Sequence, residues 1–473
     1  MDHQPPSPTT KPHILIITFP AQGHLNPAIN LAKRLLSSTN SDITFCTATT
    51  AHCRMFPSLP SPASPILHNG ITYIPFSDGF SSLQNANDTD LRSLVSQVRE
   101  LGSSHLTTIL QDLASSGRPV TCLIYTIMVQ WAGDVATELR IHSALYWIQA
   151  ATILSIYHHF FNGYESFIVS HAKDPSFPIS FPSLPTFQIR DLPNFLTITS
   201  PDDPFFDILN AFRKLFTDLS LRRQAGEKPR VLVNSFDELE MNALAPMEEH
   251  MELITVGPAV LNEAEGETED MFEEDEEEYM EWLDSQEDKS VVYVAFGSVH
   301  KMSKEEIEEI GKGLKESQRP YLWVIGKDRR WHDMNIVGEV KQGMVLKWCK
   351  QGRVLRHKAV GCFVTHCGWN STLEGLLYGV PAVAMPKWSD QATNAWLMER
   401  QWGMGLKAEV GEKGWVLSEE LRRCLDIVMG EGERGVEMRM KAEMWKEKAR
   451  KAISEGGSSE KNLMAFGCQR NKH

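Results

Sequence analysis

Short runs of apolar, often β-branched residues recur along the first half of the chain and alternate with segments in which apolar positions follow helical spacing. These runs predict buried strands at residues 13–19, 42–47, 71–74, 120–125, 231–234 and 254–257. Helical spacing begins near Pro27, returns over residues 91–113, and follows Trp131. Strands that alternate with helices in this way are typical of a doubly wound α/β sheet.

Two segments interrupt this alternation. Residues 172–207 are rich in Pro, Phe and Ser, and proline excludes a central strand or a helix interior, so we expect an ordered loop with buried aromatic side chains that forms a wall of a cleft. Residues 263–281 hold 12 acidic side chains and no Lys or Arg. Because so many like charges repel one another, this segment is predicted to be a solvated linker.

The α/β pattern restarts after the acidic segment, with predicted strands at 290–296, 321–325, 360–365 and 382–385 and an amphipathic helix over 304–317. The sequence therefore predicts two doubly wound domains in tandem, with a ligand cleft between them beyond the carboxyl ends of the strands. The expected boundaries are a disordered N-terminus over 1–11, a first domain over 12–255, a linker over 256–282, a second domain over 283–455 and a final helical segment over 456–473.

Charge and cysteine usage narrow the class of protein. The net charge of −14 and the pI of about 5.6 argue against a nucleic-acid partner or an anionic membrane surface, since both require basic patches. The 8 cysteines are scattered without a CxxC pair, which favours reduced thiols. No secretory signal and no apolar run of ~18 residues is found. We expect a cytoplasmic protein without a membrane span, acting as a monomer.

The strongest chemical signal is a strand-to-helix turn. The predicted strand 360–365 ends in HCGWNS, and TLEGLLYG continues as a helix. Such a turn presents free backbone N–H groups and the positive end of the helix, which suits a diphosphate. Gly368 permits close backbone approach, and the side chains of His366, Asn370 and Ser371 add donors. Glu374, in the first helical turn, would be repelled by phosphate, so we assign it to a ribose hydroxyl.

Residues around the turn extend this hypothesis to a whole nucleotide sugar. Trp348 precedes the strand and can stack on a base, while Asp390 and Gln391 follow the next strand and can bind sugar hydroxyls. The alternative is a purely structural tight turn, capped by Asn and Ser and without a ligand. A zinc site built on Cys362, His366 and Cys367 is disfavoured, because strand alternation separates Cys362 from the turn.

The 44 residues from Trp348 to Gln391, WCKQGRVLRHKAVGCFVTHCGWNSTLEGLLYGVPAVAMPKWSDQ, match without insertion the signature box of the family 1 UDP-dependent glycosyltransferases of plants. The resemblance extends over nearly the whole chain, including PAQGHLNP near the N-terminus. It implies two Rossmann-like domains facing across a cleft, the GT-B type, with the C-terminal helix returning to the N-terminal domain. Within the family, the chain is similar to the branch that includes anthocyanin 5-O-glucosyltransferases and crocetin or auxin glucosyl-ester-forming enzymes.

The resemblance also implies a role for each matching residue. The expected contacts are Trp348 and the Cys349 backbone with uracil, Gln351 and Glu374 with ribose, Ser298, His366, Asn370 and Ser371 with the phosphates, and Trp369, Asp390 and Gln391 with the sugar. In this family Gln at the last box position accompanies glucose and His accompanies galactose, so Gln391 favours UDP-glucose as donor substrate. No cofactor and no metal are implied.

His24 follows the first strand, in a loop before the helix expected near Pro27. An imidazole can take a hydroxyl proton at neutral pH, and the resemblance makes His24 the general base of an inverting reaction. Many relatives have an Asp after the fourth strand that orients this histidine, whereas Thr126 stands there in this chain. A Thr can hydrogen-bond His24 but cannot neutralise an imidazolium. Asp134, further on, is expected to be an exposed helix residue.

The acceptor is the less determined half of the reaction. We expect a small hydrophobic acceptor, with a phenolic hydroxyl of a flavonoid or anthocyanin as the main hypothesis and glucose-ester formation on a carboxylate as the alternative. A UDP-sugar-binding protein without transfer is a third hypothesis, suggested by the missing Asp. Asp88 and Asp90 have a spacing that binds metal and diphosphate in another glycosyltransferase architecture, but helix capping explains them better.

Overall fold

The computed structural model describes residues 11–59, 61, 63–79, 91–260, 276–297, 302–326 and 343–468. Its N-terminal half contains an eight-stranded sheet with the strand order β10-β9-β6-β5-β1-β2-β4-β3, in which only the β3–β4 pair is antiparallel. The strands are β1 (His13–Ile17), β2 (Asp42–Ala48), β3 (Ile66–His68), β4 (Ile71–Phe76), β5 (Cys122–Thr126), β6 (His142–Trp147), β9 (Arg230–Val233) and β10 (Glu252–Thr255).

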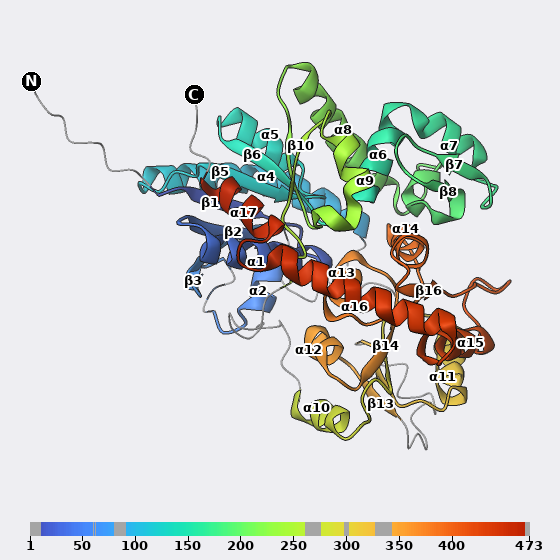
Figure 1. Ribbon diagram of the computed structural model, residues 1–473. Helices are drawn as coiled ribbons and strands as arrows, with labels where there is room; N and C mark the ends of the chain where they lie inside the picture. The colour runs from blue at the N-terminus through green and yellow to red at the C-terminus, as the bar shows by residue number, and fades with distance from the viewer. Residues whose placement is uncertain are drawn as a thin grey trace, which may run out of the picture.

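The C-terminal half contains a six-stranded parallel sheet with the order β13-β12-β11-β14-β15-β16. Its strands are β11 (Val291–Ala295), β12 (Tyr321–Val324), β13 (Gly343–Leu346), β14 (Val360–Thr365), β15 (Ala382–Ala384) and β16 (Gly405–Lys407). The strands expected from the sequence are therefore present, and Figure 1 shows the two sheets in separate halves of the molecule.

Helices pack around both sheets. Those of the N-terminal half are α1 (Gln22–Ser38), α2 (Thr49–Met55), α4 (Leu91–Ser115), α5 (Trp131–Glu138), α6 (Ala151–His159), α7 (Glu165–His171), α8 (Phe206–Gln224) and α9 (Asp237–Met247), with the short π-helix η1 (Phe160–Tyr164) and the 3₁₀ turns η2 (Ile189–Asp191) and η3 (Asn194–Thr197). Those of the C-terminal half are α10 (Glu276–Asp284), α11 (Lys304–Glu316), α12 (Gln351–Arg356), α13 (Trp369–Tyr378), α14 (Gln391–Trp396), η6 (Leu397–Gln401), α15 (Ser418–Met429) and α16 (Glu433–Ile453).

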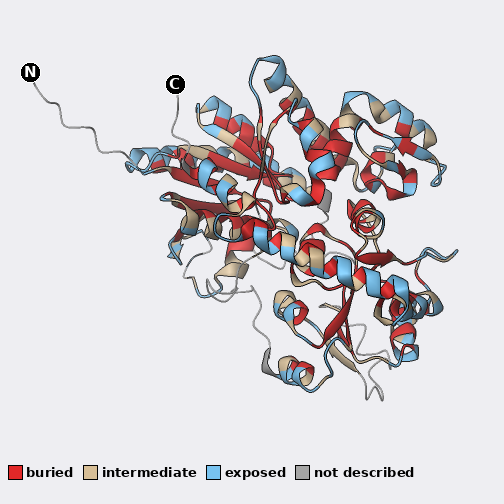
Figure 2. Cartoon of the chain, viewed as in Figure 1, coloured by how far each residue is buried: buried red, intermediate tan, exposed pale blue. Residues whose placement is uncertain are grey.

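The central strands are buried on both faces, as their continuous apolar sequences predict. Every residue of β1 and of β11 is buried, and Figure 2 shows buried strands inside helices whose outer faces are exposed. The apolar core is also continuous between the halves, because Trp369 and Trp402 of the C-terminal half belong to the same buried cluster as the N-terminal sheet. The two halves thus share a packed interface.

In each sheet the chain adds strands first on one side of a central strand and then on the other side, which creates a topological switch point. In the first sheet β1 lies between β2 and β5, and in the second β11 lies between β12 and β14. In open α/β sheets ligands bind beyond the carboxyl ends of the strands at such a switch point. His24 follows β1, and the HCGWNS turn follows β14, so the two predicted parts of the site follow the two switch points.

The proline-rich middle segment is ordered, and it contains an antiparallel hairpin of β7 (Pro178–Ser180) and β8 (Thr186–Gln188) that the sequence analysis did not predict. Proline is compatible with this hairpin because Pro178 is the first residue of a short, two-stranded sheet and leaves no central ladder incomplete. The expected burial of aromatic side chains is confirmed for Phe181, Phe187 and Phe195, which are at most 4% exposed.

The chain ends by returning to its N-terminal half, as the family resemblance implied. Helix α16 runs along the C-terminal half, and α17 (Ser458–Cys468) then packs on α1 and β10, as Figure 1 shows in red. Ser459 Oγ donates to the Gly257 carbonyl at 2.6 Å, and Asn462 Nδ2 donates to the Thr255 carbonyl at 3.1 Å. Across the described ranges, no helix is both long enough and apolar enough to span a bilayer.

Candidate active site

The HCGWNS turn starts a helix whose first amides have no intrahelical acceptors. Strand β14 is buried throughout, Cys367 has a left-handed backbone (φ 64°), and Gly368 is the N-cap of α13. The first N–H groups of α13 therefore point out of the helix end, where an anion is favoured by both hydrogen bonding and the helix dipole. The turn has the geometry that the sequence predicted for a diphosphate site.

His366 lies between two glycines. A Cβ atom added to Gly297 would lie 2.7 Å from His366 Nε2, and one added to Gly368 would lie 2.6 Å from the same atom. Any side chain at either position would displace the imidazole. Gly368 thus has a reason to be glycine beyond close approach to a ligand, since it leaves room for the histidine ring.

The two residues assigned to ribose lie together and contact the turn. Gln351 Nε2 donates to Ser371 Oγ at 2.9 Å and also to the Glu374 carboxylate. Gln351 Oε1 in turn accepts from the Tyr293 hydroxyl at 3.2 Å. This network connects the start of α12 with α13, where Ser371 lies in the first turn and Glu374 in the second turn rather than in the first turn expected from the sequence. No sequence pattern singles out Tyr293.

The residues assigned to uracil lie in the short connection between β13 and α12. Trp348 is half-buried, whereas Cys349 is buried with its thiol 3.4 Å from the Tyr293 hydroxyl. Tyr293 therefore packs against both the predicted base site and the predicted ribose site. Ser298, assigned to the phosphates, lies outside the described residues.

The Trp369 side chain packs at the interface between the two halves. Its indole is buried, and Nε1 donates to the Asn234 carbonyl of the N-terminal half at 2.8 Å. Asn234 Oδ1 accepts from the Ala259 amide at 2.8 Å, which fixes the segment that contacts Trp369. The indole therefore stabilises the interface, which leaves only the Trp369 backbone for the sugar contact that the resemblance implies.

Asp390 and Gln391 are buried at the start of α14. Gln391 Oε1 accepts from the backbone amides of Lys387 (2.9 Å) and Trp388 (3.1 Å), so that its NH₂ group is the end left to donate. Burial raises the pKa of Asp390, against hydrogen bonds from Asn394, Ser389 and Gln149 that lower it. Gln149 belongs to the N-terminal half, and its buried Oε1 has no hydrogen-bond partner among the described residues. No pattern in the sequence singles out Gln149.

His24 lies in the first turn of α1, which corrects the expectation of a loop before a helix near Pro27. The helix begins at Gln22 and includes Pro27 in its interior. Because proline has no N–H, the Gly23 carbonyl has no donor four residues later in its own helix. That carbonyl instead accepts from Asn370 Nδ2 of the phosphate turn at 3.0 Å. This bond places the helix that carries the predicted base against the predicted donor site.

The His24 side chain is half-buried beside an aromatic ring. Its ring centroid lies 5.5 Å from that of Phe19, and Nδ1 is buried without a hydrogen-bond partner among the described residues. Burial lowers the pKa of His24 to about 4, and the nearby Ile127 carbonyl opposes this shift to a smaller degree. The side chain is thus a neutral imidazole at physiological pH, the form that can accept a proton.

Thr126 is fully buried at the end of β5, but its hydroxyl is engaged elsewhere. Thr126 Oγ1 lies 3.0 Å from Thr18 Oγ1 and donates to the Ile127 carbonyl at 3.3 Å. Thr18 Oγ1 donates to the His24 backbone carbonyl at 3.3 Å. The two threonines therefore support the backbone of the His24 turn. Asp134 is exposed on α5 and pairs with Lys214, as expected.

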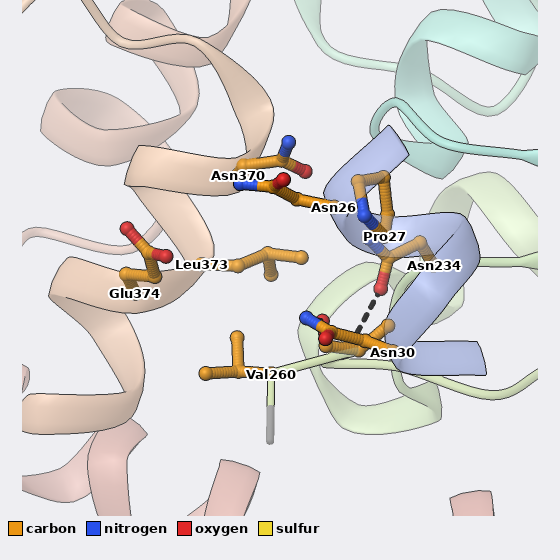
Figure 3. Close-up of a pocket in the computed structure, with 9 residues that line it drawn as sticks. Asn26, Pro27, Asn30, Asn234, Val260, Asn370, Leu373 and Glu374 are labelled. Carbon is orange, nitrogen blue, oxygen red and sulfur yellow. Dashed lines mark hydrogen bonds between the residues drawn. The ribbon is translucent and has the colours of Figure 1, made fainter. Parts of the chain in front are cut away.

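A small cavity separates the start of α1 from the start of α13 (Figure 3). Asn26, Pro27 and Asn30 line it from α1, facing Leu373 and Glu374 on α13. Asn30 Nδ2 donates to the Ala259 carbonyl at 2.8 Å. No sequence pattern indicates a role for Asn26 or Asn30, because only the tertiary structure brings α1 opposite α13.

The metal alternatives gain no support within the described ranges, where no three acidic, His or Cys side chains cluster as ligands. Cys362 and Cys367 are fully buried, and burial raises the pKa of the Cys362 thiol to about 12, which opposes the thiolate form that zinc needs. Asp88 and Asp90 lie outside the described residues.

Comparison with known proteins identifies the family to which the chain belongs. Residues 264–439 match the family model described as UDP-glucoronosyl and UDP-glucosyl transferase. The chain is 44% identical to UDP-glycosyltransferase 75C1 of Solanum lycopersicum (98% of this chain, 99% of the relative) and 42% identical to a chloroplastic crocetin glucosyltransferase of Gardenia jasminoides (96% of each). The crystal structure of Os79 from O. sativa in complex with UDP superposes with a TM-score of 0.82 at 30% identity, covering 96% of this chain and 99% of that one.

These matches span both sheets and confirm the GT-B arrangement expected from the sequence. They also set aside the hypothesis of a UDP-sugar-binding protein without transfer. The chain belongs to the family 1 UDP-dependent glycosyltransferases of plants and is an enzyme, a UDP-glycosyltransferase of the hexosyltransferase class.

Proposed function

We propose that this enzyme transfers glucose from UDP-glucose to a hydroxyl group of a small aromatic acceptor, with His24 as the general base. The observation that carries this proposal is the hydrogen bond of Asn370 to the Gly23 carbonyl, which brings the base-bearing turn of α1 against the phosphate turn at α13. A base and a leaving-group site must lie on either side of one anomeric carbon, and this contact brings the elements that carry them together.

The reaction follows from these positions. The acceptor oxygen attacks the anomeric carbon of glucose while its proton passes to the neutral imidazole of His24. The bond from that carbon to the UDP oxygen breaks, so the α linkage of the donor becomes a β linkage in the product. Amides at the N-terminus of α13 and the His366 side chain stabilise the departing diphosphate, which is the work that a metal ion performs in other transferases.

The resemblance favours glucose through Gln391, and neighbouring amides fix the orientation of this side chain. Two backbone amides occupy Gln391 Oε1, so its NH₂ group is held as a donor for a sugar hydroxyl. Gln391→Glu retains the two accepted bonds and removes the donor, and we expect about a tenfold loss in kcat/KM for UDP-glucose. An unchanged value would remove Gln391 from the sugar site.

A second candidate acceptor is a carboxylate, which would give a glucose ester. The relative named as a crocetin glucosyltransferase, 42% identical to this chain, supports testing it. A carboxylate is already ionised at neutral pH and has no proton to give, so this reaction would depend less on His24.

An acceptor screen with mass detection tests the proposal. Phenols and aromatic or aliphatic carboxylic acids are supplied with UDP-glucose or UDP-galactose, and products are treated with alkali, which cleaves esters and spares phenolic glucosides. We expect alkali-stable glucosides from UDP-glucose and loss of their formation in His24→Ala. A wild-type rate in that variant would show that His24 is not the base, and preferential use of UDP-galactose would contradict the choice of glucose.

A further inference from the structure

Ser389, the residue before Asp390 and Gln391, has a left-handed backbone conformation. Its φ is 62°, a value that non-glycine residues rarely adopt because of contact between Cβ and the backbone. Such a conformation persists when neighbouring groups hold it. The neighbours of Ser389 therefore decide how the chain enters the predicted sugar-binding pair.

Asn194, from the opposite half of the molecule, binds both backbone groups of Ser389. The Ser389 amide donates to Asn194 Oδ1 at 2.7 Å, and the Asn194 amide donates to the Ser389 carbonyl at 3.2 Å. Asn194 begins the 3₁₀ turn η3 in the proline-rich segment. Its side chain is exposed, so its position depends on what anchors the turn.

The turn is anchored on both sides of Asp390 and Gln391. Before them, the Phe195 ring packs edge-on against Trp388, with centroids 5.9 Å apart. After them, Thr393 Oγ1 of α14 donates to the Asp191 carbonyl at 2.6 Å. Asp191, which is 6% exposed, also pairs with Lys407 of β16 at 2.8 Å. Residues 191–195 thus form a brace against the C-terminal half, with Asn194 at Ser389.

We propose that Asn194 is a positioning residue for the donor sugar, holding Ser389 in the left-handed turn that directs Asp390 and Gln391 toward the hexose. The inference rests on the proposed function, because it takes Asp390 and Gln391 as the residues that meet the sugar. Without the hydrogen bond to the Asn194 side chain, Ser389 relaxes toward negative φ, which rotates the peptide leading into Asp390. The uracil, ribose and phosphate contacts come from other segments and stay in place.

The test compares two ligands that differ only in the hexose. Titration calorimetry measures the Kd of UDP and of UDP-glucose, without acceptor, for wild type and for Asn194→Ala. We expect about a tenfold weaker Kd for UDP-glucose and a change of less than about twofold for UDP. General loosening of the fold would weaken both ligands together, and equal effects on the two would overturn the inference.

Three variants sharpen this result. Asn194→Asp keeps an acceptor oxygen for the Ser389 amide and is expected to retain most of the selectivity for UDP-glucose. Ser389→Gly in the Asn194→Ala background should restore part of it, because glycine adopts positive φ at little cost. Thr197→Val removes a hydroxyl that donates to the Asn194 carbonyl at 2.9 Å within the same turn, and should leave both Kd values unchanged.

Failure of this inference differs from failure of the proposed function. If wild type neither binds UDP-glucose more tightly than UDP-galactose nor transfers glucose, the proposed function is wrong. If wild type does both and Asn194→Ala keeps the wild-type ratio of the two Kd values, only the role of Asn194 is wrong. Should Asn194→Ala not fold, Asn194→Leu takes its place, because it keeps a side chain of similar size and has no acceptor for the Ser389 amide. A wild-type ratio of the two Kd values in that variant would show that Asn194 does not position the sugar-binding pair.

Discussion

Asn370 donates its side-chain amide to the Gly23 carbonyl, a group that Pro27 leaves without a donor in its own helix. The bond joins residues 347 positions apart and connects the base-bearing turn with the phosphate turn. A proline inside a helix ordinarily destabilises it because one backbone acceptor loses its partner. Here the other half of the molecule supplies the missing donor.

Pro27→Ala should uncouple these two turns. An alanine amide gives the Gly23 carbonyl a donor within α1, and that donor competes with Asn370. We expect the melting temperature to stay the same or rise, while kcat falls about fivefold, the size of one lost hydrogen bond. Pro246→Ala, which changes a proline inside α9, is the matched control and should leave kcat unchanged. A raised melting temperature with an unchanged kcat would show that the contact has no part in catalysis.

The pH dependence of the reaction should reflect the lowered pKa of the His24 imidazole. Because burial lowers its pKa to about 4, the ring stays neutral as the pH falls through 6.5, where an exposed histidine would become protonated. With an acceptor that does not ionise in this range, kcat/KM should show no acid-side loss between about pH 8 and pH 5.5. An acid limb with an apparent pKa near 6.5, the value of an unperturbed histidine, would mean that the base is more solvated than the structure shows.

Thr126→Val tests whether the threonine acts on the imidazole or on the backbone. Valine keeps the shape and removes the hydroxyl that contacts Thr18 and the Ile127 carbonyl. We expect a loss of about 1 kcal/mol in the free energy of unfolding and a kcat within about twofold of wild type. Denaturant titration and initial rates provide the two measurements. A drop in kcat beyond about tenfold would assign the orienting role to Thr126 itself.

Glu240 should be one of the side chains on which the stability of the N-terminal half depends most. Its fully buried carboxylate accepts from the amides of Ala151 (2.8 Å) and Thr152 (2.9 Å) and from the hydroxyls of Thr152 (2.9 Å) and Ser235 (2.6 Å). Burial raises its pKa, while these donors oppose that shift.

Glu240→Gln replaces one accepting oxygen with a donor, which then faces donors. Leaving a buried donor unsatisfied costs about 1–3 kcal/mol, so we expect a loss of that size in the free energy of unfolding. Glu238→Gln, exposed on the same helix, should stay within about 0.5 kcal/mol of wild type. Equal stability of the two variants in urea would contradict the role given to the buried carboxylate. The activity of folded enzyme should be unchanged in both.

Much of the fold was predictable because the signals are local. Runs such as HILII and VGCFVT are almost entirely apolar, as is typical of strands buried on both faces, and the two sheets formed where those runs predicted them. The predicted start of α1 near Pro27 is too late, because the helix begins at Gln22 and has the proline in its interior. The missed hairpin of β7 and β8 has strands of 3 residues each, too short for a periodic signal.

By itself the sequence determined the donor turn, because the strand, the glycine-containing turn and the helix start of that site are contiguous between Trp348 and Gln391. Only the tertiary structure decided which distant groups meet it. The Gly23 carbonyl reaches Asn370, Asn194 reaches Ser389, and the Thr126 hydroxyl contacts Thr18 and Ile127. Such pairings depend on how the two sheets pack and where each side chain then points, and no local pattern of residues specifies either.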